Sequence, residues 1–205
     1  MPAMLSSPPD HPGELIERIR AAAADRTPLR LQGGGTKAFL AEPAPGTLLS
    51  TTGYAGIISH EPSELVVTVK AGTPLAELES VLAAAGQSLA FEPPHFGPGA
   101  TVGGAVAAGL AGPARAAVGG ARDYVLGVRL INGRGELLTF GGQVMKNVAG
   151  YDVSRLLAGS LGILGVICEV SLKVLPRPGV LSSVIVPCIS ATSRDTMDRP
   201  SPVPP

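Results

Sequence analysis

Three glycine-rich segments carry the residues whose chemistry is easiest to interpret. They read Gly-Gly-Gly-Thr-Lys at 33–37, Gly-Pro-Gly-Ala-Thr-Val-Gly-Gly at 97–104, and Gly-Ser-Leu-Gly-Ile-Leu-Gly at 159–165. Because glycine reaches positive φ at little steric cost, successive backbone N–H groups can turn toward one point and bind an anion. Three such loops, each beside an apolar run, predict an extended ligand that carries a diphosphate, as a dinucleotide does.

Composition limits the other classes of function. The 205 residues, 45% of them hydrophobic, suit one domain or two small subdomains. Lys+Arg and Asp+Glu both number 16, so no basic field is present to attract nucleic acid or an anionic membrane. No apolar run reaches the roughly 18 residues of a membrane span, and the first residues lack the features of a signal peptide. We therefore expect a cytoplasmic protein.

The two cysteines form no CxxC motif and are too few for an iron–sulfur cluster. We expect no metal site, and we interpret Cys168, within an apolar strand pattern, as a core residue.

The elements that must position the loops mix helices and strands. Hydrophobic spacing predicts a helix over 12–24, strands over 29–31 and 65–70, and a second helix that begins at Pro74. Apolar residues at helical spacing are expected to form the inner faces of these helices: Leu15, Ile16, Ile19 and Ala23 in the first, and Leu75, Leu78, Val81, Leu82 and Ala85 in the second.

The second half predicts a hairpin, a short helix and a strand. Residues 124–131 and 136–140 flank the turn Asn132-Gly133-Arg134-Gly135, and Asp152 is expected to cap a helix over 152–157. In the strand over 165–174, Val166, Cys168, Val170 and Leu172 alternate with Ile167, Glu169, Ser171 and Lys173. Small residues over 105–111 predict close backbone packing. Strands and helices do not alternate in a strict βαβ order, so the pattern favours an α+β fold over a doubly wound sheet.

Three segments follow from the sequence pattern and composition. Residues 1–28 form an N-terminal helix and lead-in, residues 29–187 form the main domain, and the polar residues 188–205 are expected to be a disordered tail.

Two nucleotide-binding motifs are disfavoured. Residues 33–38 satisfy the GxGxxA variant of the Rossmann fingerprint, but Pro43 and Pro45 would end the long helix that this motif needs. Lys37 follows Thr36 rather than glycine, so no P-loop is present. The triple glycine taken alone also fits a flexible turn, and that alternative stays open.

Several blocks together resemble a known group of flavoproteins. Thr101-Val102-Gly103-Gly104, Arg122-Asp123-Tyr124-Val125-Leu126-Gly127 and the block from Gly159 to Ile167 look like the FAD-binding (PCMH-type) domain of the vanillyl-alcohol oxidase and p-cresol methylhydroxylase superfamily. Glu92-Pro93-Pro94-His95-Phe96-Gly97 and residues 144–152 resemble the FAD-binding E subunits of bacterial glycolate oxidase. The resemblance covers roughly residues 29–178.

The resemblance implies a two-subdomain PCMH-type fold with noncovalent FAD between the subdomains, because no histidine lies in the first loop. It assigns the diphosphate and the rest of the cofactor to Gly33, Gly34, Gly35, Thr36, Lys37, Gly99, Thr101, Gly103, Gly104, Ala108, Gly112, Gly165, Val166 and Ile167. Leu161 and Ile163 replace an acidic residue and a threonine of the family pattern, and Gly109 stands where relatives often have asparagine.

The resemblance also implies partners. It implies a heteromeric enzyme that oxidises glycolate or a related 2-hydroxy acid, with a larger FAD-binding subunit, an iron–sulfur subunit, and attachment to the inner membrane only through those subunits. The family's C-terminal substrate cap domain is expected to be missing, so no catalytic residue is assigned and the chain is not expected to act alone. The alternative is a noncatalytic docking subunit or a truncated remnant.

Three basic residues near the loops have open roles. His95 fits either a position beside the flavin or partner, or a solvated or bracing position in its loop. Lys37 and Lys146 fit either a positive charge near the cofactor or the ordinary protein surface.

Overall fold

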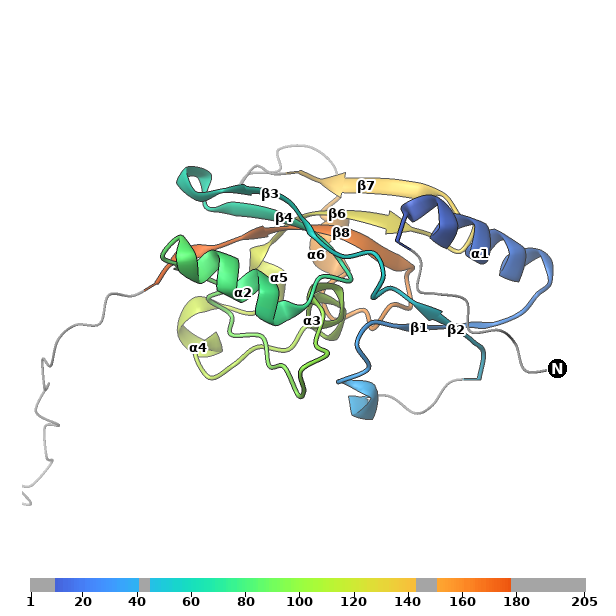
Figure 1. The fold of residues 1–205 in the computed structure, drawn as a ribbon, viewed down its shortest axis with the longest axis horizontal. Coiled ribbons are helices and arrows are strands. Elements are labelled where there is room, and N and C mark those ends of the chain that lie inside the picture. Colours follow the sequence, from blue (N-terminus) through green and yellow to red (C-terminus); the bar gives the residue numbers. More distant parts are fainter. Residues whose placement is uncertain (1–9, 41–44, 143–150, 178–205) are drawn as a thin grey trace, which may run out of the picture.

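The computed structural model describes residues 10–40, 45–142 and 151–177. The predicted α+β fold is confirmed, and Figure 1 shows helices packed against a central sheet. In chain order the elements are α1 (Pro12–Ala24), β1 (Leu29–Gln32), η1 (Ala38–Leu40), β2 (Thr47–Ser50), β3 (Ile57–Glu61), η2 (Pro62–Glu64), β4 (Val66–Lys70), α2 (Leu75–Ala84), β5 (Gln87–Ser88), α3 (Val102–Ala108), α4 (Arg115–Val118), α5 (Ala121–Tyr124), β6 (Val125–Ile131), β7 (Leu137–Gly141), α6 (Val153–Leu156), β8 (Val166–Lys173) and β9 (Leu175–Pro176).

The main sheet is antiparallel throughout, with the strand order β3-β4-β8-β6-β7. The strand β8 therefore lies in the middle, and all of its residues except Lys173 are buried. The strands β1 and β2 are parallel to each other and form a separate two-stranded sheet beside the main one. The short strands β5 and β9 form another pair, which is antiparallel. The first glycine loop begins where β1 ends, so it belongs to the small parallel pair rather than to the main sheet (Figure 1).

Helices cover the sheet through two hydrophobic clusters. The larger cluster joins α2 and α3 to the sheet through residues such as Leu78, Val106 and Val170. The smaller cluster joins α1 to β2, β6 and β8 through Leu15, Leu49 and others. The helix α1 begins as its sequence predicts, because His11 Nδ1 accepts a hydrogen bond from Gly13 N at 3.0 Å and Pro12 supplies the first turn.

Three details of the predicted helices are wrong. Val81 and Ala85 in the second helix, and Ala23 in the first, are exposed rather than part of the inner face. Ala23 and Ala85 lie at the C-terminal ends of their helices, where the partner surface has ended, whereas Val81 comes directly before the fully buried Leu82 and lies at the edge of the inner face. Periodicity gives the direction of a helix face but not the length over which a partner covers it.

The predicted alternation along β8 is also wrong beyond Cys168. Arg129 pairs with Glu169 while the next residue, Leu130, pairs with Ile167, so Cys168 is an additional residue that forms a β-bulge. Val166 and Cys168 consequently lie in the smaller cluster, whereas Val170 lies in the larger one. The prediction that Cys168 is a core residue is confirmed, and burial raises the pKa of its thiol to about 12.

The stretch predicted to pack closely, 105–111, overlaps the helix α3, which the sequence analysis did not predict. Its small residues carry no apolar periodicity, yet they bring the helix close to β4: Gly103 N donates to Ala71 O at 2.8 Å.

The predicted hairpin of β6 and β7 and the cap at Asp152 are confirmed, and the Asp152 carboxylate accepts from Arg155 N at 3.3 Å. No helix among the described residues is long and apolar enough to cross a bilayer. The tail at 188–205 lies outside the described residues.

Candidate cofactor site

All three glycine segments meet at one cleft. Its larger part, about 460 Å³, lies between β1, the first glycine loop and residues 161–163. Its smaller part, about 150 Å³, lies between β1, α3 and the start of β8. Both parts are lined by Gly33, Lys37, Gly104 and Gly162, so they form one continuous cleft. The larger part alone falls within the roughly 300–1,000 Å³ range of small-molecule and cofactor sites.

The first two loops touch each other through their backbones. A Cβ added at Gly34 would lie 1.5 Å from Gly99 O, and one added at Gly33 would lie 2.5 Å from Thr101 Oγ1. No side chain fits at Gly34 without moving the backbone of the other loop. The flexible-turn alternative for the triple glycine does not explain this contact, because a free turn would not need it.

The second loop is held rigidly. Thr101 is buried, and its hydroxyl accepts a hydrogen bond from Gly104 N at 3.2 Å at the start of α3. Gly103 would place a Cβ 2.6 Å from Ala71 Cβ, so glycine is required for α3 to approach β4 this closely.

The third segment is more exposed. Its apolar side chains Leu161 and Ile163 line the larger part of the cleft, and Ile163 is 84% exposed. Gly165 has a φ of +145°, and a Cβ there would lie 2.6 Å from Ile131 O, so it forms a tight entry into β8. Leu161 and Ile163 thus place an apolar wall opposite the first loop.

The structure brings together nearly every residue that the resemblance assigned. The cleft is lined by Gly33, Gly34, Gly35, Thr36, Lys37, Thr101, Gly103, Gly104, Ala108, Gly165, Val166 and Ile167. Gly99 lies behind Gly34 rather than on the cleft wall. Gly112 is outside the cleft lining, and its N–H donates to Phe91 O at 3.0 Å beside Glu92.

Some lining residues were not predicted from sequence. They come from β1, from η1, and from the ends of β2 and β4: Leu31, Gln32, Leu40, Thr51 and Ala71. Thr51 belongs to no recognisable motif and reaches the cleft because its N–H donates to Gln32 O at 3.0 Å. Only Ala71 carried a sequence signal, since it precedes a glycine at the end of a predicted strand.

The charge on the cleft wall is positive. Among the described residues that line it, Arg30 and Lys37 are the charged ones, and none is Asp, Glu or His. Burial lowers the pKa of the Lys37 ammonium, and its Nζ lies 3.5 Å from His95 O and 5.8 Å from the centre of the Phe96 ring. A diphosphate would be complementary to this wall. Lys146 lies outside the described residues.

His95 has a partner of its own. Its Nε2 lies 2.9 Å from Glu79 Oε2 on α2, with both side chains partly exposed. This contact favours the bracing interpretation, in which His95 connects its loop to α2.

Comparison with known proteins agrees with this geometry. Residues 8–141 match the family described as "FAD binding domain". The chain belongs to this family. FAD is therefore its cofactor, and the cleft with its glycine loops and cationic wall fits a dinucleotide diphosphate.

Relatives of this FAD-binding domain include oxidoreductase components. The chain is 54% identical over 169 residues to glycolate oxidase subunit GlcE of Escherichia coli, which covers 82% of this chain and 48% of that protein. It is 34% identical over 142 residues to D-lactate dehydrogenase of Anaerostipes hadrus, which covers 69% of this chain and 30% of that protein. The chain thus spans about half, or less, of the length of these relatives.

The fold also matches solved structures. An alkyldihydroxyacetonephosphate synthase superposes with a TM-score of 0.67 and 24% identity, over 83% of this chain and 34% of that chain. At this identity the match shows the fold alone, which is the fold of the predicted PCMH-type group.

Proposed function

We propose that this chain is the FAD-binding subunit of a heteromeric enzyme that oxidises glycolate or a related 2-hydroxy acid to the 2-oxo acid. The observation that carries the proposal is the contact between Gly34 and Gly99 at a cleft with a cationic wall. The 54% identity to glycolate oxidase subunit GlcE supports the choice of substrate class.

The residues of the cleft would hold FAD without a covalent bond. Backbone N–H groups of Gly33, Gly34 and Gly35, with the Thr36 hydroxyl and Lys37, would bind the diphosphate from one side. Gly103 and Gly104 would approach it from the other side, and Ala108, Gly165, Val166 and Ile167 would lie along the rest of the cofactor. Among described residues the cleft lining contains no histidine or cysteine, which supports noncovalent binding. Gly99 and Thr101 would keep the two loops together.

Bound FAD supplies an acceptor for the electron pair that leaves the hydroxy acid. The reaction also needs a base for the hydroxyl proton and a cation for the substrate carboxylate. Arg30 and Lys37 are cations on the cleft wall, but no described lining residue is a carboxylate or a histidine. We infer that the base comes from other parts of the assembly, and that the chain as given does not turn over substrate alone.

The proposed assembly contains a larger FAD-binding subunit and an iron–sulfur subunit that takes the electrons. The word "subunit" in the name of the E. coli relative supports a multi-chain enzyme. We place the complex in the cytoplasm, attached to the inner membrane only through the partners. Residues 29–187 would form the FAD-binding domain, with 1–28 as its lead-in and 188–205 as a tail.

The first experiment is the visible absorption spectrum of the purified protein, followed by acid precipitation. Absorption bands near the flavin wavelengths and release of intact FAD into the supernatant are the expected results. A colourless protein that neither binds added FAD nor gains thermal stability from it would overturn the proposal. Flavin that stays with the precipitated protein would overturn noncovalent binding only.

A second candidate, a noncatalytic docking subunit, is favoured by the absence of acid–base side chains among the described cleft-lining residues. The two candidates differ in what the assembled complex needs. Replacement of Gly34 and Gly104 should abolish glycolate oxidation by the complex if FAD on this chain takes part. Full activity of a complex that contains the replaced chain would favour the docking role.

A further inference from the structure

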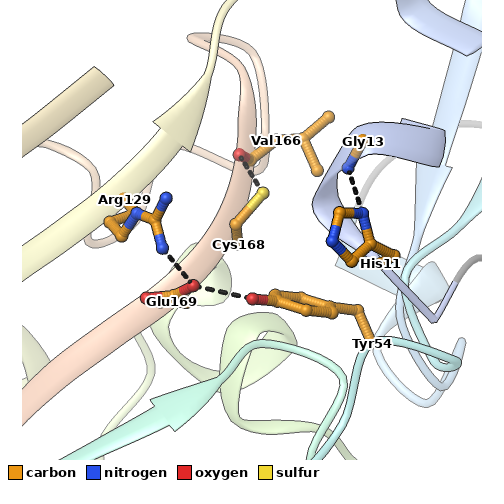
Figure 2. A network of polar contacts seen from close by, with 7 residues as sticks. All are labelled: His11, Gly13, Tyr54, Arg129, Val166, Cys168 and Glu169. Carbon is orange, nitrogen blue, oxygen red and sulfur yellow. Dashed lines mark hydrogen bonds and ion pairs between the residues drawn. The ribbon is translucent and has the colours of Figure 1, made fainter. Parts of the chain in front are cut away.

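A polar network lies at the smaller cluster, and none of its three residues, Tyr54, Arg129 and Glu169, lines the cleft. Figure 2 shows Glu169 on β8 between Arg129 on β6 and Tyr54, which lies in the connection between β2 and β3. The Tyr54 hydroxyl donates to Glu169 Oε1 at 2.7 Å, and Arg129 Nη1 donates to the same oxygen at 2.7 Å. Tyr54 and Glu169 are both buried.

The bulge in β8 creates this network. Since Cys168 is the additional residue, the side chain of Glu169 is turned to the side on which Tyr54 lies. Burial and the neighbouring Glu169 carboxylate raise the pKa of Tyr54, so its phenol is protonated at neutral pH and donates the hydrogen bond.

Tyr54 connects this bulge to the first glycine loop. Its N–H donates to Thr51 O at 3.2 Å, and Thr51 N in turn donates to Gln32 O at 3.0 Å. Gln32 is the last residue of β1, directly before Gly33. The Glu169 side chain therefore reaches the first loop through three consecutive hydrogen bonds.

The same bulge also holds the second glycine loop, through its backbone. Cys168 O accepts from Ala71 N at 2.6 Å, and Ala71 O accepts from Gly103 N at 2.8 Å. Gly72 connects the two routes, because its N–H donates to Tyr54 O at 2.9 Å. The first and second glycine loops are distant in the sequence, yet hydrogen bonds connect both of them to Cys168 and Glu169 on β8.

We infer that the bulge at Cys168 and Glu169 sets the spacing between the two diphosphate-binding loops, and that Tyr54 and Glu169 are positioning residues for FAD. Neither side chain lines the cleft, so neither touches the cofactor site directly. The inference rests on the proposed FAD site and assigns a role to residues that no glycine motif includes.

The test is Tyr54→Phe, which keeps the ring and removes only the hydroxyl. Its matched control is Tyr124→Phe: Tyr124 is also buried, and its hydroxyl donates to Val118 O at 2.7 Å, but it is on neither route to the loops. Each variant loses one hydrogen bond from a tyrosine hydroxyl: the bond of Tyr54 is buried and goes to a carboxylate, and the bond of Tyr124 is partly buried and goes to a carbonyl, so Tyr54→Phe should lose somewhat more thermal stability as apoprotein. Only Tyr54→Phe is expected to weaken FAD binding, by about tenfold, and to change the visible circular dichroism of FAD bound at saturation.

Glu169→Gln is the second variant, and it keeps the test informative if Tyr54→Phe does not fold. The amide oxygen still accepts from Tyr54 but carries no charge, so we expect a loss of affinity of about threefold, smaller than for Tyr54→Phe. The inference is overturned if Tyr54→Phe and Glu169→Gln bind FAD as the unaltered protein does, or if Tyr124→Phe weakens binding equally. If the unaltered protein binds no FAD, the proposed function fails, and this inference fails with it.

Discussion

Glycine has different roles in two regions of the molecule. One region is the contact between the first two glycine loops, and the other is the third glycine segment, 159–165. At Gly34 a Cβ would lie 1.5 Å from Gly99 O, whereas at Gly159 a Cβ would meet no atom within 4 Å. Gly159 is instead required by its φ of +86°. Glycine at the first site permits contact between distant segments, and glycine at the second permits a local turn. Substitutions should therefore have different costs at the two sites.

Gly34→Ala should have the largest effect. The added methyl group collides with backbone, which cannot rotate away, so we expect a loss of about 3 kcal/mol or more in the free energy of unfolding and no measurable FAD binding. Denaturant unfolding and FAD titration would measure both. The control is Gly133→Ala in the hairpin turn, where a Cβ meets no atom within 4 Å and stability should change by less than about 0.5 kcal/mol. Equal stability of the two variants would show that the loops are not in contact.

Gly103→Ala should have the next largest effect. Its methyl group would lie 2.6 Å from Ala71 Cβ, and overpacking of this kind costs about 1–3 kcal/mol, partly offset by the better helix propensity of alanine. Gly104→Ala in the same helix meets only the Thr101 hydroxyl at 3.0 Å, so the apoprotein should lose less stability. Thermal unfolding of the two apoproteins compares them directly. A Gly103 variant at least as stable as the Gly104 variant would contradict the close packing of α3 on β4.

Gly159→Ala tests the local requirement in the third segment. With no steric contact, its cost should be the strain of a left-handed backbone, about 1–2 kcal/mol, and FAD affinity should change by less than about twofold. Gly159→Asn should cost less, because asparagine tolerates this conformation better. If alanine and asparagine destabilise the protein equally, backbone conformation is not the reason for this glycine.

Ile163→Ser should have the smallest effect on stability and a specific effect on binding. Because Ile163 is 84% exposed, we expect a change of less than about 0.5 kcal/mol in the apoprotein. It lines the cleft, so loss of apolar contact with bound FAD should lower affinity by about three- to tenfold. Leu164→Ser is the control, because Leu164 is exposed in the same segment but does not line the cleft. Fluorescence titration with FAD distinguishes them, and equal affinities would remove Ile163 from the site.

Local sequence rules predicted many of the elements correctly. The hairpin of β6 and β7 follows from a turn with two glycines between apolar runs, and α1 follows from its apolar spacing. Both features depend on residues that are close together in the chain. The helix α3 was not predicted, because Ala and Gly give no hydrophobic periodicity.

The bulge in β8 shows where such rules fail. A period of two predicts that Val166, Cys168 and Val170 share one face, yet an additional residue moves Val170 to the other cluster. Nothing in the apolar pattern marks Cys168 as that residue, since each position of the strand is compatible with burial. The register of β6 against β8 decides it.

The sequence by itself determined that three loops can adopt positive φ, that strands and helices alternate irregularly between them, and that the chain carries no excess charge. These properties depend on residue type and short-range spacing. Only the tertiary structure decided that Gly34 faces Gly99, that Gly112 lies outside the cleft, and that Tyr54 reaches Glu169. Each of these depends on how elements distant in the chain pack against one another, and packing is decided by the whole core rather than by any single segment.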